Sequence, residues 1–309
     1  MDGFLLVDKA GAMTSHDVVA MARKKLDTKK VGHAGTLDPM ATGVLVLGVG
    51  IATRLLTYIT DGKKAYEATI NLGSATHTDD KDGDVISTAT ADQIAKINDE
   101  LITNELAKFV GIIKQRPSSV SAIKIDGKSA HARVRAGEIV DIPERDVTID
   151  EIVVKEIRHT ATAIEVDVSV TCSAGTYIRA IARDLGERLS LGGHLTSLRR
   201  TLVSPFTLQD CHPLAQAPLI SISAVIEKLF PIRKLDLAQS REITFGRVIE
   251  QNQQSGVVAA LDSQDNFLAL LENKLQGSQV VAAPILVKVS EYLCFMKEYA
   301  DEGISSWNL

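Results

Sequence analysis

Two long runs of alternating polar and apolar residues constrain the fold more than any other feature of this 309-residue chain. They cover about residues 147 to 157 and 163 to 172, and the polar tripeptide Arg158-His159-Thr160 separates them. Alternation with a period of two is typical of strands with one buried face, and a short polar connection joins such strands into a hairpin. We therefore expect an antiparallel sheet built around this hairpin.

Other periodic segments predict further strands and helices. Strands are expected at Gly43 to Gly48, at Tyr66 to Leu72 and near 195 to 203. Helices are expected from Ser15 as N-cap through Leu26, over 92 to 109, over 128 to 137 after a turn at Asp126-Gly127, and from Thr176 to about Leu189. Hairpin-paired strands with helices inserted between them favour an α+β fold with a mixed, largely antiparallel sheet.

The chain is predicted to have two domains. Residues 204 to 232 are irregular and carry four prolines, and they precede a last piece of about 75 residues. Short strands are expected in that piece at 256 to 261, 267 to 271, 279 to 281 and 285 to 289. We therefore place one large domain at 1–230 and a small β-rich domain at 231–309.

Charge is unevenly distributed. The formal net charge is −5, and residues 79 to 100, with seven acidic residues against two lysines, account for all of it. Residues 111 to 145 and 176 to 200 each carry a net charge of +3. Charge alone leaves two interpretations open: ordinary solvated faces, or a surface for a polyanionic partner.

Several classes of protein are excluded by what the sequence lacks. No apolar run approaches the roughly 20 residues of a membrane helix, and the N-terminus shows no secretory signal. The three cysteines are widely spaced, which argues against a disulfide framework, so we expect a cytoplasmic protein. There is no phosphate loop, no complete dinucleotide fingerprint and no GxSxG motif, and the seven histidines are scattered. We expect neither a cofactor nor a metal.

One loop remains as a candidate for chemistry. Residues 32 to 43 hold a single acid, Asp38, among small and turn-forming residues directly before an apolar strand. Asp38-Pro39 has a structural explanation, since Asp before Pro initiates turns. The functional interpretation rests on Gly32, Gly35 and Gly43, which allow a ligand to approach, and on the nearby His33.

The segment Gly32 to Arg54, GHAGTLDPMATGVLVLGVGIATR, resembles the catalytic segment of the TruB family of bacterial tRNA pseudouridine synthases. Five other segments resemble the remaining motifs of that family in the same order. They are Val7 to Asp17, Lys63 to Gly73, Ser118 to Lys124, Gly175 to Gly186 and His194 to Arg200. The resemblance covers about residues 3 to 205.

This resemblance implies a pseudouridine synthase fold, with residues 111–145 as an insertion that clamps RNA and a C-terminal domain of the PUA type. The family converts uridine 55 in the tRNA T-loop to pseudouridine. That isomerisation is redox-neutral and needs no cofactor or metal. The implied partner is therefore the T-arm stem-loop of tRNA, and we expect the protein to act as a monomer.

The resemblance also assigns roles to individual residues. Asp38 matches the essential aspartate, which either attacks C1′ as a nucleophile or takes the 2′-proton; the sequence leaves both routes open. The substrate-binding residues of the family match Arg179 as the partner of Asp38, Tyr66 as the ring stacked on the base, Tyr177 and Leu198 as pocket walls, and His33 as a wedge that replaces flipped bases.

The chain departs from the family pattern at a few positions. Ala10 replaces a common proline, and Val120 and His131 stand where tyrosines are common in the insertion. Residues 233 to 309 carry seven basic against ten acidic residues, which predicts a weak or reshaped RNA contact. Two alternatives stay open: an RNA-binding or tRNA-folding factor that holds the T-arm without chemistry, and a glycosidase, which would need a second acid beside Asp38.

Overall fold

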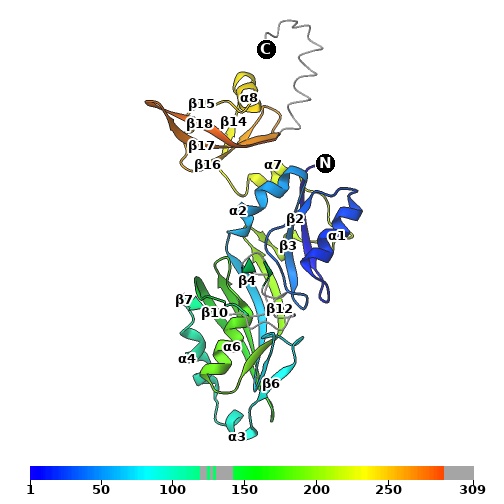
Figure 1. Cartoon of the computed structure of the whole chain (residues 1–309), viewed down its shortest axis with the longest axis vertical. Helices are drawn as coiled ribbons and strands as arrows, with labels where there is room; N and C mark the ends of the chain where they lie inside the picture. The colour runs from blue at the N-terminus through cyan, green and yellow to red at the C-terminus, as the bar shows by residue number, and fades with distance from the viewer. Residues whose placement is uncertain (119–123, 126–127, 130–141, 289–309) are drawn as a thin grey trace. The chain divides into compact units, whose positions relative to one another are not determined.

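The computed structural model describes residues 1–118, 124–125, 128–129 and 142–288, and the contacts within it form two compact units (Figure 1). The larger unit comprises 5–48 and 53–218, and the smaller unit comprises 1–4, 49–52 and the chain from 219 onward. The domain boundary after residue 230 stays a prediction. Val120, His131 and the turn at Asp126-Gly127 lie outside the described residues.

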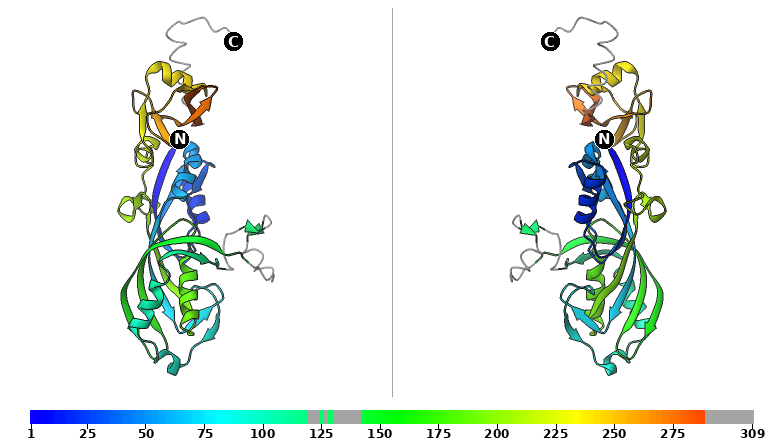
Figure 2. Two further views of the ribbon diagram at one scale, coloured as in Figure 1. Left: turned by 90° about the vertical axis from the view of Figure 1, so that its left-hand side faces the viewer. Right: turned by 90° about the vertical axis from the view of Figure 1, so that its right-hand side faces the viewer.

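A nine-stranded sheet forms the larger unit. Seven strands follow the order β1 (Gly3–Lys9), β3 (Thr42–Val49), β12 (Gly193–Val203), β4 (Lys64–Leu72), β11 (Ile164–Cys172), β10 (Arg145–His159) and β7 (Gly111–Gln115). Two short strands extend it: β2 (Val31–His33) pairs with β3, and β13 (Phe206–Thr207) pairs with β12. The pairs from β12 to β7 are antiparallel, whereas β3 and β12 run parallel. Figure 2 shows the twisted sheet from two sides.

The predicted hairpin is confirmed as β10 and β11. Ile152 pairs with Val170 and Val154 with Val168, and two register shifts bend the longer strand. Along β11, every second side chain is buried, from Ile164 to Cys172. The alternation in the sequence therefore marks the inner face of the sheet.

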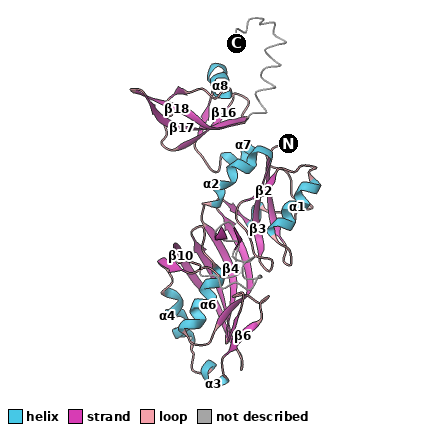
Figure 3. Ribbon diagram, in the orientation of Figure 1, coloured by secondary structure: helices cyan, strands magenta, loops and turns pink. Residues whose placement is uncertain are grey.

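The described part of the larger unit also contains helices. The longest are α1 (Ser15–Lys25) and α6 (Ile178–Arg188), and shorter ones are α2 (Leu56–Thr60), α3 (Ala91–Ile94) and α4 (Asp99–Ala107). α6 packs on β12 and β4, and α4 contacts α6 and β10 (Figure 3). In the described part of the chain no helix exceeds eleven residues, so none provides the roughly 20-residue apolar span of a membrane helix.

Three helix predictions need correction. Thr14, and not Ser15, caps α1, because Asp17 three residues later completes a capping box with it. The helix expected over 92 to 109 is two helices, since Asn98 starts a new one by accepting a hydrogen bond from Leu101. Lys128–Ser129 is strand β9, paired with β8 (Lys124–Ile125), rather than the start of a helix.

The smaller unit is β-rich, as predicted. Its five-stranded sheet has the order β14 (Ile232–Lys234), β16 (Val257–Leu261), β17 (Phe267–Gln276), β18 (Gln279–Val287) and β15 (Ile249–Glu250). The two strands expected after residue 278 are the single strand β18, and helix α8 (Leu237–Thr244) was not predicted. Ile243 of α8 joins Ala260, Leu271 and Ala282 in the buried core. The predicted α+β fold with a small β-rich C-terminal part is thus confirmed.

Candidate active site

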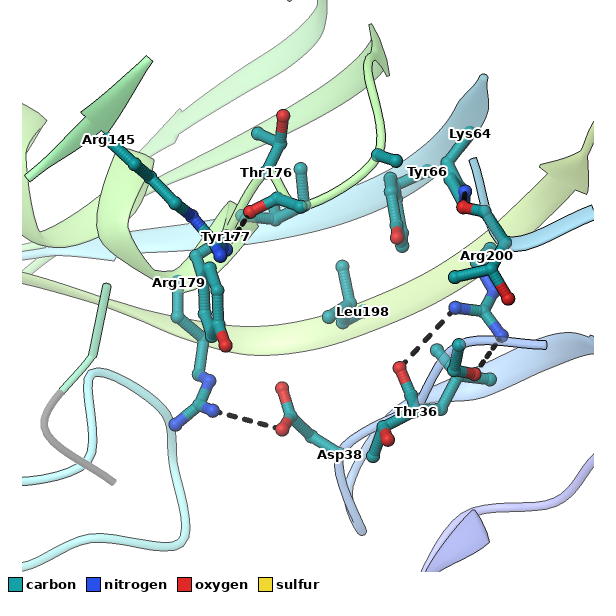
Figure 4. Close-up of a pocket in the computed structure, with 16 residues that line it drawn as sticks. Thr36, Asp38, Lys64, Tyr66, Arg145, Thr176, Tyr177, Arg179, Leu198 and Arg200 are labelled. Atoms are coloured by element: carbon teal, nitrogen blue, oxygen red, sulfur yellow. Dashed lines mark hydrogen bonds and ion pairs between the residues drawn. The ribbon is translucent and has the colours of Figure 1, made fainter. Parts of the chain in front are cut away.

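A pocket of about 340 Å³ opens in the larger unit beside the loop that carries Asp38 (Figure 4). Most of its wall comes from the loop itself, the strands β4 and β12, and the segment that leads into α6, and Thr60 of α2 and Arg145 of β10 complete it. The lining side chains that the following paragraphs use are Asp38, Lys64, Tyr66, Arg145, Tyr177, Arg179, Leu198 and Arg200.

Asp38 and Arg179 form an ion pair in this pocket. Asp38 Oδ1 lies 2.9 Å from Arg179 Nη2, although 141 positions separate the two residues. The arginine side chain is 4% exposed, whereas the carboxylate is 31% exposed. The turn at Asp38-Pro39 is also present, since Ala41 N donates to Asp38 O at 3.1 Å. The backbone of Asp38 therefore makes the turn while its carboxylate is left to face Arg179 and the pocket.

The same guanidinium contacts a second carboxylate. Arg179 Nη1 lies 3.3 Å from Asp80 Oδ2 and donates to Thr78 O at 2.8 Å. Asp80 is buried, and its neighbour Asp79 is buried against Arg183 at 3.3 Å. These two acids belong to the acidic run that the sequence left open as a solvated face, and that interpretation is wrong for both. Arg179 and Arg183 are about 100 positions away from these two acids in the sequence, so no local pattern predicts the network.

Burial raises the pKa of the Asp38 carboxyl above its ordinary value, because an ion is poorly solvated there. The positive charge of Arg179 opposes that rise, and the negative charge of Asp80 adds to it. The carboxylate therefore has a higher affinity for a proton than a free aspartate, while Arg179 and, more weakly, Lys9 favour its ionised form.

Three buried side chains hold the loop around Asp38. Arg200, 2% exposed, donates to Val44 O at 2.8 Å, to Gly35 O at 3.1 Å and to Thr36 O at 3.4 Å. Ser15 Oγ accepts from Leu37 N at 2.8 Å and donates to Leu37 O at 3.1 Å. Lys9 Nζ donates to Pro39 O at 3.3 Å. Because buried backbone groups on both sides of Asp38 are bonded, the loop is held in one conformation.

Gly43 lets the loop strand lie directly beside β12. Its φ is +102°, a conformation that residues with a side chain rarely adopt. A Cβ atom there would lie 2.2 Å from Arg200 O, so any larger residue would separate β3 from β12. Glycine at this position thus keeps Arg200 close to the loop that it holds.

The aromatic and aliphatic residues predicted to grip a base line the pocket. Tyr66 on β4 and Leu198 on β12 are 9% and 6% exposed, and their strands are adjacent. Tyr177 stands at the N-cap of α6, where its backbone N–H and C=O both bond to the side chain of Gln115. The guanidinium of Arg145 lies 4.9 Å from the centre of the Tyr177 ring. A flat ring would meet apolar surface from three different segments.

His33 does not line the pocket. It ends β2, and its ring lies edge-on to the ring of His16 at 5.5 Å between centroids. Burial and the nearby charges of His16 and Arg200 lower the pKa of His33, so the neutral ring is favoured. Its role as a wedge in RNA stays a prediction.

Sequence reasoning missed three cations in the pocket wall: Lys64, Arg145 and Arg200. Two of them had a sequence signal, since Lys64 stands two residues before Tyr66 and Arg200 two residues after Leu198. Residues two apart on a strand share a face. Within the described residues, no group of three His, Cys, Asp or Glu side chains could hold a metal ion.

The fold and this pocket together define an enzyme-like site in which one carboxylate, paired with a buried arginine, faces a space for a flat ring. Residues 23–178 match the N-terminal domain of the TruB family of pseudouridylate synthases, and residues 179–222 match a C-terminal domain of tRNA pseudouridylate synthase B. The chain belongs to the TruB family.

Similar proteins cover nearly the whole chain. Proteins named tRNA pseudouridine synthase B from Rhodococcus jostii and Nocardia farcinica are 50% and 49% identical to it, covering 88% and 93% of this chain and 90% and 93% of their own. Among solved structures, a Cbf5-Nop10-Gar1 complex matches with a TM-score of 0.66 at 24% identity, over 93% of this chain and 84% of that one. An H/ACA ribonucleoprotein bound to a substrate RNA containing 2'-deoxyuridine also matches at 0.66, with 21% identity, over 92% and 84%. Both likenesses concern the fold.

Proposed function

We propose that this chain is a tRNA pseudouridine synthase that isomerises uridine 55 in the T-loop of tRNA. The observation that carries the proposal is the carboxylate of Asp38, held by Arg179 at the edge of a pocket with aromatic and aliphatic walls. The relatives named tRNA pseudouridine synthase B support both the reaction and the class of RNA.

The reaction breaks the bond between C1′ and N1 of the uridine and forms a bond between C1′ and C5, while C5 loses its proton to water and N1 gains one. Asp38 assists either by attacking C1′ or by taking the 2′-proton, and each role requires the ionised carboxylate. Arg179 fixes the direction of the carboxylate and favours its charge. Its own position is fixed by Asp80 and by Thr78 O.

The target base is stacked inside an RNA loop and must leave the stack, at a cost of a few kcal/mol. Burial of the uracil ring between Tyr66, Leu198 and Tyr177 offsets part of that cost. The pocket also holds the detached uracil near C1′ while it turns from N1 to C5. His33, outside the pocket, is proposed to occupy space that flipped bases leave.

We also propose that the T-arm is the part of tRNA that binds, with the basic 111–145 insertion on its phosphates. The expectations that the protein is a monomer in the cytoplasm, with a catalytic domain at 1–230 and a PUA-like domain at 231–309, belong to the same proposal. The acidic balance of the last part of the chain assigns most of the RNA contact to the first domain.

Incubation of the purified protein with an unmodified T-arm stem-loop tests the function. We expect one pseudouridine at the position equivalent to 55, mapped by chemical probing and mass spectrometry. Pseudouridine at another uridine would keep the chemistry and contradict the substrate. Tight binding without any product would instead favour the non-catalytic T-arm factor, and release of free uracil would favour a glycosidase.

A further inference from the structure

Lys64 is a buried cation in the pocket wall that the chemistry proposed above does not use. It stands two residues before Tyr66 on β4, and both side chains line the pocket (Figure 4). The residue is 5% exposed, and its ammonium group donates to the carbonyl oxygens of Thr60 and Gly62. An ammonium group has three N–H donors. Within the described residues, two are used and one is left for the pocket.

Within the described residues no carboxylate is bonded to this lysine, and the exposed Asp61 acts on it only at longer range. Both of its hydrogen-bond partners are neutral carbonyl groups, and no described carboxylate forms an ion pair with it. Burial and, to a smaller extent, the positive charge of Arg200 lower the pKa of Lys64 to about 8, and the negative charge of Asp61 only partly opposes this shift. Arg200 lines the same pocket, and its hydrogen bonds to the loop also go to carbonyl groups. Buried positive charge of this kind is unfavourable unless an anion joins it.

The ligand can supply that anion. A uracil ring and a ribose are neutral, whereas the phosphodiester groups on either side of a nucleotide are negatively charged. We propose that Lys64, with Arg200 beside it, binds a phosphodiester group next to the flipped nucleotide. This proposal rests on the proposed function, because it takes the pocket's ligand to be a nucleotide within RNA. It assigns Lys64 to substrate binding and positioning rather than to the chemical step.

Removing each partner of this contact, singly and together, tests the proposal. The substrate is a T-arm stem-loop in which a neutral methylphosphonate replaces one of the two linkages that flank the target uridine. We expect Lys64→Gln to lower kcat/KM by roughly tenfold and to reduce its logarithmic salt dependence by about 1. The methylphosphonate at the contacted linkage should lower the kcat/KM of the unmodified enzyme by a similar factor. It should not lower the kcat/KM of Lys64→Gln any further.

Lys63 provides a matched control. It precedes Lys64 in the sequence, but its side chain is 64% exposed and pairs with Asp150 at 2.9 Å outside the pocket. Lys63→Gln should keep the kcat/KM of the unmodified enzyme and its full sensitivity to the methylphosphonate. Lys64→Arg, which keeps the charge, should keep that sensitivity too.

Two results would overturn the proposal. In the first, the loss of kcat/KM in Lys64→Gln adds in full to the loss caused by methylphosphonate at either linkage. That result is expected if the lysine only connects β4 to the turn at Thr60 and Gly62. In the second, methylphosphonate at either linkage leaves the kcat/KM of the unmodified enzyme unchanged. This second measurement does not depend on whether a variant folds. Absence of pseudouridine with the native stem-loop would instead contradict the proposed function itself.

Discussion

At the scale of single residues, the site depends on how three charges share a small volume. Arg179 lies between Asp38 and Asp80, so one buried cation serves two carboxylates. Of the two carboxylates, Asp38 is the more exposed and faces the pocket, whereas Asp80 is buried against the guanidinium. This difference lets Asp38 meet a ligand while Asp80 holds the arginine in place.

The pH dependence of activity should report the pKa of Asp38. Only the ionised carboxylate can attack C1′ or take a proton, so activity falls as the pH drops through this pKa. Because burial raises the pKa, the acidic limb of kcat/KM should lie above the ordinary value of 3.8. Arg179→Met removes a charge that lowers this pKa, so its residual activity should show the limb at higher pH than in the unmodified protein.

Measurement of kcat/KM against pH for both proteins checks this prediction, with Lys63→Gln as a control whose limb should stay in place. A limb that moved to lower pH in Arg179→Met would contradict the assigned electrostatics.

At the scale of elements, a loop becomes a rigid site because α1, β1 and β12 each contribute one anchoring side chain. Ser15 from α1 bonds both backbone groups of Leu37, Lys9 from β1 reaches Pro39 O, and Arg200 from β12 binds the residues before them. The residues adjacent to Asp38 are thus fixed on both sides. The energy of these bonds secures the position of the carboxylate.

Ser15→Ala should disturb this loop. The change removes both hydrogen bonds to Leu37 and leaves a buried N–H and C=O unsatisfied, at a cost of about 1–3 kcal/mol in the free energy of unfolding. We expect single-turnover kinetics to show that kcat falls clearly more than the affinity for the stem-loop. Urea denaturation measures the loss in the free energy of unfolding.

Thr14→Ala is the matched control. It removes the N-cap of the same helix, at a cost of about 1 kcal/mol, without touching the loop. An equal loss of kcat in both variants would mean that helix stability, and not the loop contact, matters.

Sequence patterns predicted the elements where the local signal and the tertiary contacts agree. β11 buries every second side chain along its length, so its alternation identified it, whereas β18 was divided in two because Ala282, Ala283 and Pro284 interrupt its alternation. Along β10 only Val147 and Ile149 are buried, and pairing with β11 extends the strand beyond them. Asp38 and Arg179 were predicted as a pair by resemblance alone. Asp80 was not assigned to the site, because its partner Arg179 lies far away in the sequence and no period encodes such a contact. Arg200 stands two residues after Leu198, which was a signal for the pocket wall, but its bonds to the loop at Gly35 and Thr36 are remote in sequence.

At the scale of the whole chain, charge is divided between its parts. Inside the larger unit, the negative charge from 79 to 100 is partly neutralised by Arg179 and Arg183, which themselves belong to the basic stretch from 176 to 200. The last part of the chain, 233 to 309, has a net charge of −3. This acidic balance is the reason why we expect the larger unit to make most of the contact with RNA.

Charge reversal in the smaller unit tests this division. Lys274, on β17, has a side chain that is 53% exposed. We expect Lys274→Glu to change the dissociation constant for the T-arm stem-loop by less than about twofold, because the smaller unit should contribute little to RNA binding. Loss of a phosphate contact would instead weaken binding and flatten its salt dependence. Titration at several salt concentrations measures both effects. A tenfold weaker affinity with a smaller salt slope would place RNA on this unit.

The central claim is that the carboxylate of Asp38 takes part in the isomerisation, and the variant Asp38→Asn tests it most directly. The amide has the same size but can neither attack C1′ nor accept the 2′-proton. With tRNA labelled by tritium at C5 of uridine, we expect tritium release to fall by at least about 10²- to 10⁴-fold, with binding of tRNA retained. Tritium release at the rate of the unmodified protein would contradict the account.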